Sequence, residues 1–266
     1  MKVIHWNISY SANIQQIYNK LQTHIDDSTI CVLLEVLPNK RDKLMELFGN
    51  VVNSVYSLDY RAPGKFDTKS RELGVLLLTS KNISVDDGGV FERALFPDRT
   101  IWAKLLVNGK ELKVAGFHSI TGCDHKKAKS INFLSFAEAV DDFRPDIVTI
   151  DANEPSMDHY QIDKMQFFDK NGNGAKVFFN ELSEIGLKDL YSIDFNPKDY
   201  VDGQPLAVSH MIKRKGPCRY DFIFGNTDRL DIEKVDYDYE GAVRATADHA
   251  MISAYVTLKG ENSILL

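Results

Sequence analysis

Cysteine is scarce in this chain, and its scarcity narrows the available chemistry. Only Cys31, Cys123 and Cys218 occur, an odd and widely spaced set that matches neither a disulfide framework nor a paired zinc motif. Such a set is typical of a reducing compartment. Long apolar runs are also missing, so no segment predicts a membrane span. The N-terminal stretch MKVIHWNISYS is too polar for a signal peptide, and we expect a cytoplasmic protein without membrane association.

An excess of positive charge is missing as well. The 32 Lys and Arg residues are outnumbered by 38 Asp and Glu, which leaves a net charge of -6. This balance argues against a protein that holds nucleic acid by bulk electrostatics. A phosphate-bearing substrate would need local basic loops and a metal ion to offset repulsion.

The remaining composition is that of an ordinary globular protein. The 266 residues are 44% hydrophobic and 26% charged, enough to fill a sizeable core. Low-complexity tracts, repeats and linker-like segments are missing from the sequence. We therefore expect a single domain over residues 1–266, a monomer, with no obligatory protein partner.

Short apolar segments predict more strands than helices. Asn108-Gly109 joins two of them as a hairpin signal, and 188–217 is rich in loop-forming residues. Helical spacing follows Ser11, a possible cap, and follows Pro38. It recurs over 126–143 and 176–186. The expected strands cover 3–8, 29–36, 51–58, 73–80, 100–107, 111–118, 147–150, 219–225, 230–239 and 249–258. The economical α/β (α+β) architecture is two mostly antiparallel sheets packed face to face, with helices outside.

Several of these strands end in a polar residue that is out of place in an apolar run. The set comprises Asn7, Glu35, His118, Asp151 with Asn153, Asp221, and Asp248 with His249. Each one alone is more often structural than functional. Converging at one edge, Glu35, Asp151 and Asp248 would repel unless they shared a hard cation, so the set predicts Mg²⁺ or Mn²⁺. Zinc is disfavoured because the His and Cys residues show no closely spaced ligand pair.

Asp151 and Asn153 follow the expected buried strand 147–150 directly. Residues two apart in an extended chain project to the same side. We expect the carboxylate and the carboxamide to face one water molecule or phosphate oxygen together.

In order and spacing, the series Asn7, Glu35, Glu72, His118, Asp151-x-Asn153, Asp221 and Asp248-His249 resembles the motifs of the endonuclease/exonuclease/phosphatase superfamily. That superfamily includes deoxyribonuclease I, exonuclease III, sphingomyelinase and the inositol polyphosphate 5-phosphatases. The resemblance runs over nearly the whole chain. It implies a four-layer α/β/β/α sandwich of the deoxyribonuclease I type, with metal-dependent phosphoester hydrolysis at one edge between the sheets.

The resemblance also implies roles for individual residues. Glu35 would be the principal metal ligand, with Asn7 and Asp248 near the ion. Asp151 with Asn153 would orient or deprotonate the attacking water. His249, held by Asp221, would be a general base or phosphate ligand, and His118, held by Glu72, would contact the scissile phosphate.

Basic residues gather beside these positions in the stretches 60–72 and 210–221. Arg71 precedes Glu72, and Lys213, Arg214 and Arg219 precede Asp221, so these four are candidate phosphate-binding residues. A third cluster follows His118. Solvated loop charge explains each about as well, but the set favours a nuclease acting on DNA, with RNA possible. The alternatives are a phosphatase or phosphodiesterase for a small phosphoester, such as a phosphoinositide, nucleotide or phospholipid headgroup, and a non-catalytic binding protein.

Overall fold

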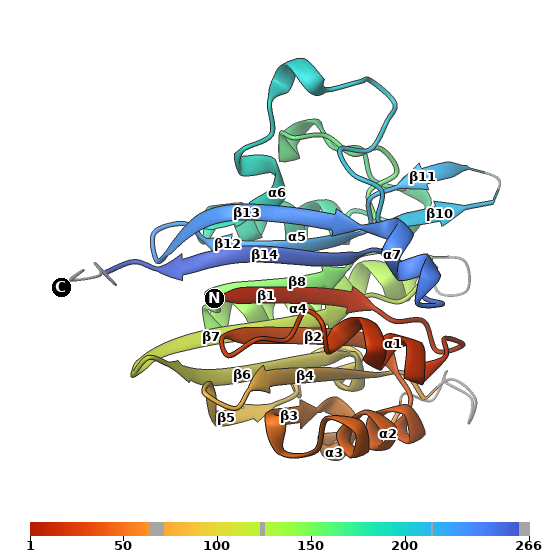
Figure 1. The fold of residues 1–266 in the computed structure, drawn as a ribbon. Coiled ribbons are helices and arrows are strands. Elements are labelled where there is room, and N and C mark those ends of the chain that lie inside the picture. Colours follow the sequence, from red (N-terminus) through yellow and green to blue (C-terminus); the bar gives the residue numbers. More distant parts are fainter. Residues whose placement is uncertain (64–71, 123–125, 214, 261–266) are drawn as a thin grey trace.

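The computed structural model describes residues 1–63, 72–122, 126–213 and 215–260, with the side chain of Lys126 excepted. Two six-stranded sheets form its centre (Figure 1). The first has the order β13 (Leu230–Asp238), β14 (Met251–Leu258), β1 (Lys2–Asn7), β2 (Thr29–Val36), β4 (Gly74–Ser80) and β3 (Val52–Tyr56). The second has the order β5 (Ser84–Gly89), β6 (Thr100–Val107), β7 (Lys110–His118), β8 (Ile147–Asp151), β12 (Asp221–Asn226) and β9 (Leu187–Asp189).

Each sheet has a single parallel pair at its middle. β1 pairs with β2 in the first sheet, and β7 pairs with β8 in the second, while all other pairings are antiparallel. Strands of a parallel pair end at the same edge of a sheet. The carboxyl ends of β1 and β8 can therefore bring polar residues to one end of the sandwich.

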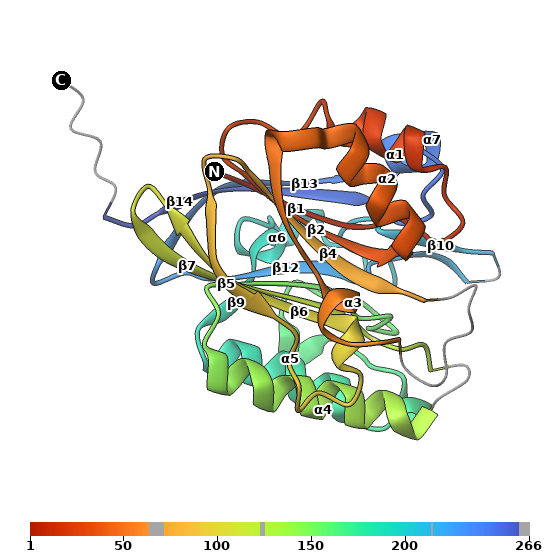
Figure 2. The ribbon, with the colours of Figure 1, turned by 90° about the horizontal axis from the view of Figure 1, so that it is seen from below.

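Helices cover the outer faces of both sheets. In Figure 2, α1, α2 and α7 lie on the side of the first sheet, and α4 and α5 lie on the side of the second. The helices are α1 (Ile14–Leu21), α2 (Pro38–Phe48), α3 (Ser57–Tyr60), α4 (Lys126–Phe143), α5 (Gly174–Glu184), α6 (Leu190–Ile193) and α7 (Tyr239–Arg244). No helix in this described part of the chain is both long and apolar enough to cross a membrane.

Three apolar layers hold these elements together. One lies between the sheets and is rich in Val, Ile and Leu. A second packs α1, α2 and α7 on the first sheet around Trp6. The third, under α4 and α5, is dominated by phenylalanine, with the rings of Phe117 and Phe136 stacked at 4.2 Å. The expected four-layer α/β/β/α sandwich is confirmed, as is the mostly antiparallel pairing.

Gly116 lets the two sheets approach closely. A Cβ atom there would lie 2.8 Å from Val32 and 2.9 Å from Ile101, closer than real Cβ contacts. The packing of Val32 and Ile101 against β7 thus depends on the missing side chain at Gly116.

The expected elements differ from the structure in four places. The expected strand 51–58 ends at Tyr56, and helix α3 begins at Ser57. The stretch 188–217 is only partly loop, because it contains α6 and the two-stranded ribbon of β10 (His210–Ile212) and β11 (Gly216–Cys218). Helix α1 is capped by Asn13 rather than Ser11, since the Asn13 side chain accepts hydrogen bonds from the amides of Gln15 and Gln16. Strand β5 and helix α7 were not expected, because both are short and polar.

The hairpin between β6 and β7 turns on Asn108 and Gly109, which have φ angles of 50° and 78°. Both values lie in the left-handed region, as a type I′ turn requires. Because no atom lies within 4 Å of a Cβ at Gly109, Gly109→Ala should cost only the conformational penalty, about 1 kcal/mol of unfolding free energy. Gly109→Asn should cost less, since asparagine tolerates this conformation. Urea denaturation measures both, and equal losses would contradict this reading.

Candidate active site

Polar side chains meet where β1, β7, β8 and β12 come together at one end of the sandwich. His118 on β7 is in register with Asp151 on β8, and Asp221 on β12 faces the same Asp151 from the other side. The Asn7 side chain, at the end of β1 in the opposite sheet, donates a hydrogen bond to Asp151 Oδ2 at 2.9 Å. We call the set Asn7, Glu35, His118, Asp151, Asp221 and His249 the polar rim.

Glu35 reaches this rim through a local irregularity of β2. Its φ of 59° lies in the left-handed region, and the pairing of β2 with β4 shifts register between Leu33 and Val36. Such a bulge re-aims a side chain at a sheet edge. One carboxylate oxygen accepts the Tyr10 amide at 3.0 Å. The other oxygen lies 3.6 Å from His118 Nε2.

Asn153 leaves the strand direction and does not continue it. Its φ of 48° turns the chain, so the expectation that Asp151 and Asn153 project together from an extended segment is wrong. Asp151 Oδ1 instead accepts the backbone amide of Asn153 at 3.0 Å, and the Asn153 side chain donates to the Ser119 carbonyl at 3.3 Å. Buried Lys129 fixes the turn by donating to the Asn153 carbonyl at 2.7 Å.

Asp221 lies fully buried between two histidines. His249 Nδ1 contacts Asp221 Oδ2 at 2.8 Å, and His5 Nε2 contacts the other oxygen at 3.1 Å. His5 is a site neighbour that the sequence reading missed. The sequence could have indicated this role, because His5 lies two residues before Asn7 in β1 and alternate residues of a strand share one face.

The buried charges shift one another's protonation. Burial raises the pKa of Asp151 to about 6, and the negative charge of Asp221 adds to this rise. Burial would also raise the pKa of Asp221, but the charge of His249 and hydrogen bonds from His249 and His5 bring it well below its usual range. Burial lowers the pKa of His249, yet Asp221 and Asp151 outweigh it and raise the value to about 10. The two carboxylates therefore favour the imidazolium form of His249.

Arg99, not Glu72, holds His118. Arg99 Nη1 lies 3.1 Å from His118 Nδ1, and arginine can only donate, so Nδ1 is the acceptor and Nε2 carries the proton. Burial, reinforced by the charge of Arg99, lowers the pKa of His118 well below its usual value. Within the described ranges no hydrogen bond or ion pair joins Glu72 to His118. No sequence pattern links Arg99 to His118, so a carboxylate partner was expected instead.

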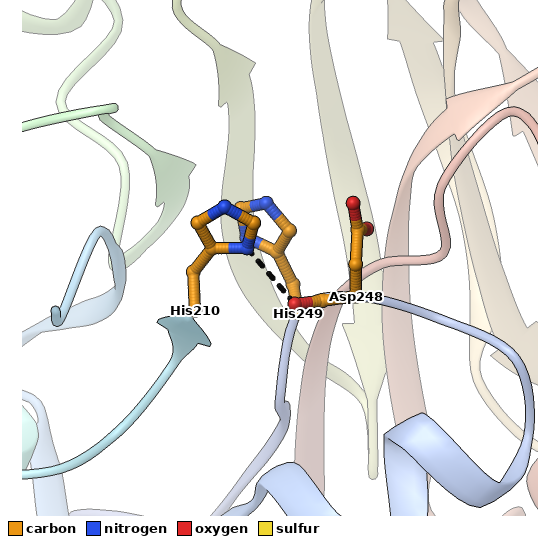
Figure 3. A group of neighbouring side chains, drawn as sticks. All are labelled: His210, Asp248 and His249. Atoms are coloured by element: carbon orange, nitrogen blue, oxygen red, sulfur yellow. Dashed lines mark hydrogen bonds between the residues drawn. The ribbon is translucent and has the colours of Figure 1, made fainter. Parts of the chain in front are cut away.

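Asp248 is exposed and lies beside His210, a residue that no sequence pattern singled out. Figure 3 shows the rings of His210 and His249 lying against each other, with the Asp248 carboxylate on the same side. The ring centroids are 4.2 Å apart, and His210 Nδ1 donates to the Asp248 carbonyl at 2.9 Å. An isolated bridge between His210 and His249 joins β10 to the segment before β14.

One of the four expected phosphate-binding residues, Arg219, is buried in the structure. Arg219 is 1% exposed and forms ion pairs with Asp158 and Asp189, so it cannot reach a substrate. The prediction for Arg219 is wrong because the local run of basic residues hides one that points into the core. Lys213 is exposed after β10. Arg71 and Arg214 lie outside the described residues.

The donors of the polar rim suit a hard divalent cation. Carboxylates from Glu35 and Asp151 and the amide of Asn7 are oxygen ligands of the kind that Mg²⁺ and Mn²⁺ prefer. Glu35 Oε1 lies beyond hydrogen-bonding distance of His118, its described ion-pair partner at this oxygen. Ligand atoms of Asp151, Asp221 and His249 also lie within 4.8 Å of one another. Both oxygens of Asp221 contact a histidine and both oxygens of Asp151 accept a hydrogen bond, so we assign Glu35 as the main residue that would hold the ion, with Asn7 and Asp151 beside it.

Solved structures with this fold cover nearly the whole chain. An endonuclease/exonuclease/phosphatase from Bacteroides vulgatus has 18% identity and a TM-score of 0.65, and the match covers 97% of this chain and 98% of that one. The 3′ phosphatase NExo from Neisseria, bound to a product DNA hairpin, has 21% identity and a TM-score of 0.66, with coverage of 97% and 99%. A mannosyl-6-phosphatase from Bacteroides thetaiotaomicron has 16% identity and a TM-score of 0.62, again with coverage of 97% and 99%.

No protein-family model matches the sequence, and no curated protein does. The chain therefore shares its fold with these structures, at low sequence identity. The chain has the deoxyribonuclease I-like fold of the endonuclease/exonuclease/phosphatase superfamily, as its motif series implied. One of these structures is a 3′ phosphatase bound to a product DNA hairpin and another is a mannosyl-6-phosphatase, so the fold alone does not select a substrate.

Arg219 offers a test that separates a structural from a substrate-binding role. Arg219→Ala leaves Asp158 and Asp189 buried without their cation, which should cost about 3–5 kcal/mol of unfolding free energy. The matched control is Arg93→Ala, because Arg93 pairs with Glu138 and Asp142 on the surface; it should cost less than about 1 kcal/mol. Guanidinium denaturation measures both. A stable Arg219→Ala protein would overturn the structural assignment.

Proposed function

We propose that this protein is a divalent-metal-dependent phosphoester hydrolase. The observation that carries the proposal is the arrangement of the Asp221–His249 pair, at 2.8 Å, next to Asp151 on the polar rim. His249 Nδ1 also lies 3.9 Å from Asp151 Oδ2. One acidic group and one cationic group thus flank the same point, where a water molecule and a phosphate could meet.

The two groups take different parts in the reaction. His249 Nδ1 faces the carboxylates of Asp221 and Asp151, which favour the imidazolium form, so we assign the ring to bind a phosphate oxygen through Nε2–H. Asp151 is the carboxylate that orients the attacking water and accepts its proton. Asn7 and the Asn153 amide hold that carboxylate in place with hydrogen bonds to its two oxygens. His249 is thus a phosphate ligand, and Asp151 is the general base.

His118 supplies a second donor to the phosphate. Its Nε2–H faces the rim, because Arg99 contacts Nδ1. As a neutral imidazole it can donate to a phosphate oxygen without adding a second positive charge beside His249. A bound Mg²⁺ or Mn²⁺ would lower the pKa of water and offset charge on the phosphate.

Loss of the Asp151 carboxylate tests this mechanism. Asp151→Asn should lower kcat at least about 100-fold, whereas Asp141→Asn, which changes an exposed aspartate on α4, should leave it unchanged. EDTA should abolish activity. Both variants should keep a melting temperature within a few degrees of the parent, because neither removes apolar packing. Activity that survived either EDTA or Asp151→Asn would refute the proposed site.

DNA is the substrate that we propose first, as a nuclease reaction, with RNA as a variant of it. The fold is shared with NExo, which was solved with a product DNA hairpin. Lys213, exposed beyond β10 on the ribbon that carries His210, could contact a polynucleotide backbone. We further propose that the protein acts as a monomer in the cytoplasm.

A small phosphoester is the second candidate, and specific observations favour it. Burial of Arg219 removes one cation from the phosphate-binding set, and the net charge of -6 gives no general attraction for a polyanion. The fold is also shared with a mannosyl-6-phosphatase. A sugar phosphate, nucleotide or inositol phosphate would need only the contacts of the polar rim.

A substrate panel separates these readings. The protein should be incubated with supercoiled DNA, single-stranded DNA, RNA, mannose 6-phosphate and inositol phosphates, each with Mg²⁺, Mn²⁺ or EDTA. We expect metal-dependent cleavage of nucleic acid, seen on gels, to exceed phosphate release from the small compounds. Release from a small compound alone would support the second candidate. Inertness towards every compound would support a non-catalytic binding protein.

A further inference from the structure

We propose that His210 is a positioning residue whose ring lies flat against His249 and sets the direction in which His249 Nε2–H points. The two ring centroids are 4.2 Å apart and the ring planes meet at 24°. Figure 3 shows one ring in front of the other. His210 belongs to the ribbon of β10 and β11, so an element outside the two large sheets completes the site. The consequence for turnover rests on the proposed function, in which His249 binds the substrate phosphate.

His249 needs a second contact because Asp221 holds only one atom of its ring. Asp221 Oδ2 lies 2.8 Å from His249 Nδ1, and Trp6 Nε1 donates to the backbone carbonyl of His249 at 3.0 Å. A hydrogen bond tolerates roughly 30° of misalignment, so these contacts define the tilt of the ring only loosely. Nε2 lies on the far side of the ring from the backbone, where a tilt displaces it most. A flat neighbour on the ring face removes that freedom.

His210 is itself held in place by neighbouring backbone. Its Nδ1 donates to the Asp248 carbonyl at 2.9 Å, and a carbonyl can only accept, so Nδ1 carries a proton. An antiparallel bridge joins His210 to His249. Beside it, the Ala250 amide donates to the Ser209 carbonyl at 2.6 Å. These contacts lie within the protein, so the His210 ring is in position before any substrate binds.

Ser209 links the ribbon to the partner of His249. The Ser209 side chain is fully buried, and its hydroxyl accepts the amides of Tyr220 at 2.8 Å and Asp221 at 3.2 Å. The Tyr220 ring also lies nearly parallel to the His210 ring, with centroids 6.4 Å apart and planes at 27°. A shift of the ribbon would therefore move both contacts of the His249 ring, the stacked face and the carboxylate.

The charges of the two rings suit the stack. The face of an aromatic ring carries negative partial charge and attracts a cation. The carboxylates of Asp221 and Asp151 favour the imidazolium form of His249. The His210 ring therefore attracts the ring that it orients. This contact uses the face of the His210 ring and not its nitrogens, so a phenylalanine could replace it.

Variants at position 210 separate stacking from direct contact with the substrate. Hydrolysis of single-stranded DNA and of mannose 6-phosphate should be measured with Mg²⁺ on the full chain. His210→Ala and His210→Leu should each lower kcat/KM about tenfold, because a small displacement of Nε2–H weakens its bond to the phosphate. His210→Phe should stay within about threefold of the parent, since it keeps the flat face.

The matched control is Met211→Ala, which changes an exposed neighbour on β10 and should leave kcat/KM unchanged. His210→Leu keeps the bulk of the side chain, so it guards against loss of folding in His210→Ala, and melting temperatures check both. Phenylalanine has no ring nitrogen. A His210→Phe protein as slow as His210→Ala would therefore overturn the positioning role, because a nitrogen of His210 would then be the group that acts.

The His249 ring reports the stack directly, without turnover. Protons that lie over the face of an aromatic ring resonate upfield because of its ring current. In ¹H–¹³C spectra without substrate, the His249 ring signals should lie upfield in the parent, His210→Phe and Met211→Ala. They should move downfield in His210→Ala and His210→Leu. Unmoved signals in those two variants would overturn the proposal.

The two measurements fail separately. Absence of hydrolysis by the parent would count against the proposed function only, because the spectra test the stack by themselves. Shifted His249 signals in His210→Ala together with an unchanged kcat/KM would show a stack that does not orient the ring for phosphate. That result would also overturn the positioning role.

Discussion

Hydrogen bonds between the two sheets hold the polar rim together, and the remaining chemistry depends on them. His5 lies on β1 of the first sheet, and His249 lies just before β14 of the same sheet. Their common partner Asp221 lies on β12 of the second sheet. Asn7 and Asp151 make the same crossing. A carboxylate is expensive to bury unless it is paired, so these contacts fix how the ends of the sheets meet. The apolar layer between the sheets sets the distance between them, and the contacts of the polar rim fix how their ends are positioned against each other.

The architecture could be predicted from the sequence because periodicity reports burial directly. Strands such as β2 and β6 were expected with the bounds that the structure has, and α4 likewise, since each presents long apolar runs or helical spacing. Short polar elements such as β5 and α7 carry no such signal. The ribbon of β10 and β11 was missed for the same reason, and His210 was missed with it.

Most residues of the candidate site could be predicted from the sequence, but fewer of the contacts between them could. Asp221 and His249 were paired correctly because their order in the chain matched a motif series. The partner of His118 was not, since Arg99 lies 19 residues away along the chain and sequence order does not show which side chain faces a ring nitrogen. Arg219 was misread because a run of basic residues says nothing about which of them points inward. Backbone turns at Glu35 and Asn153 likewise follow from tertiary contacts and cannot be read from local propensity.

The ends of the chain have a practical consequence. The Met1 amino group donates to the Val256 carbonyl at 2.8 Å, so β1 starts beside the last part of β14. Because β1 runs from there to Asn7, its starting end lies a full strand length from the rim (Figure 1). A surface anchor, fluorophore or fusion partner attached at Met1 would leave the polar rim uncovered. The protein is therefore suited to oriented immobilisation through Met1, with the polar rim facing the solution.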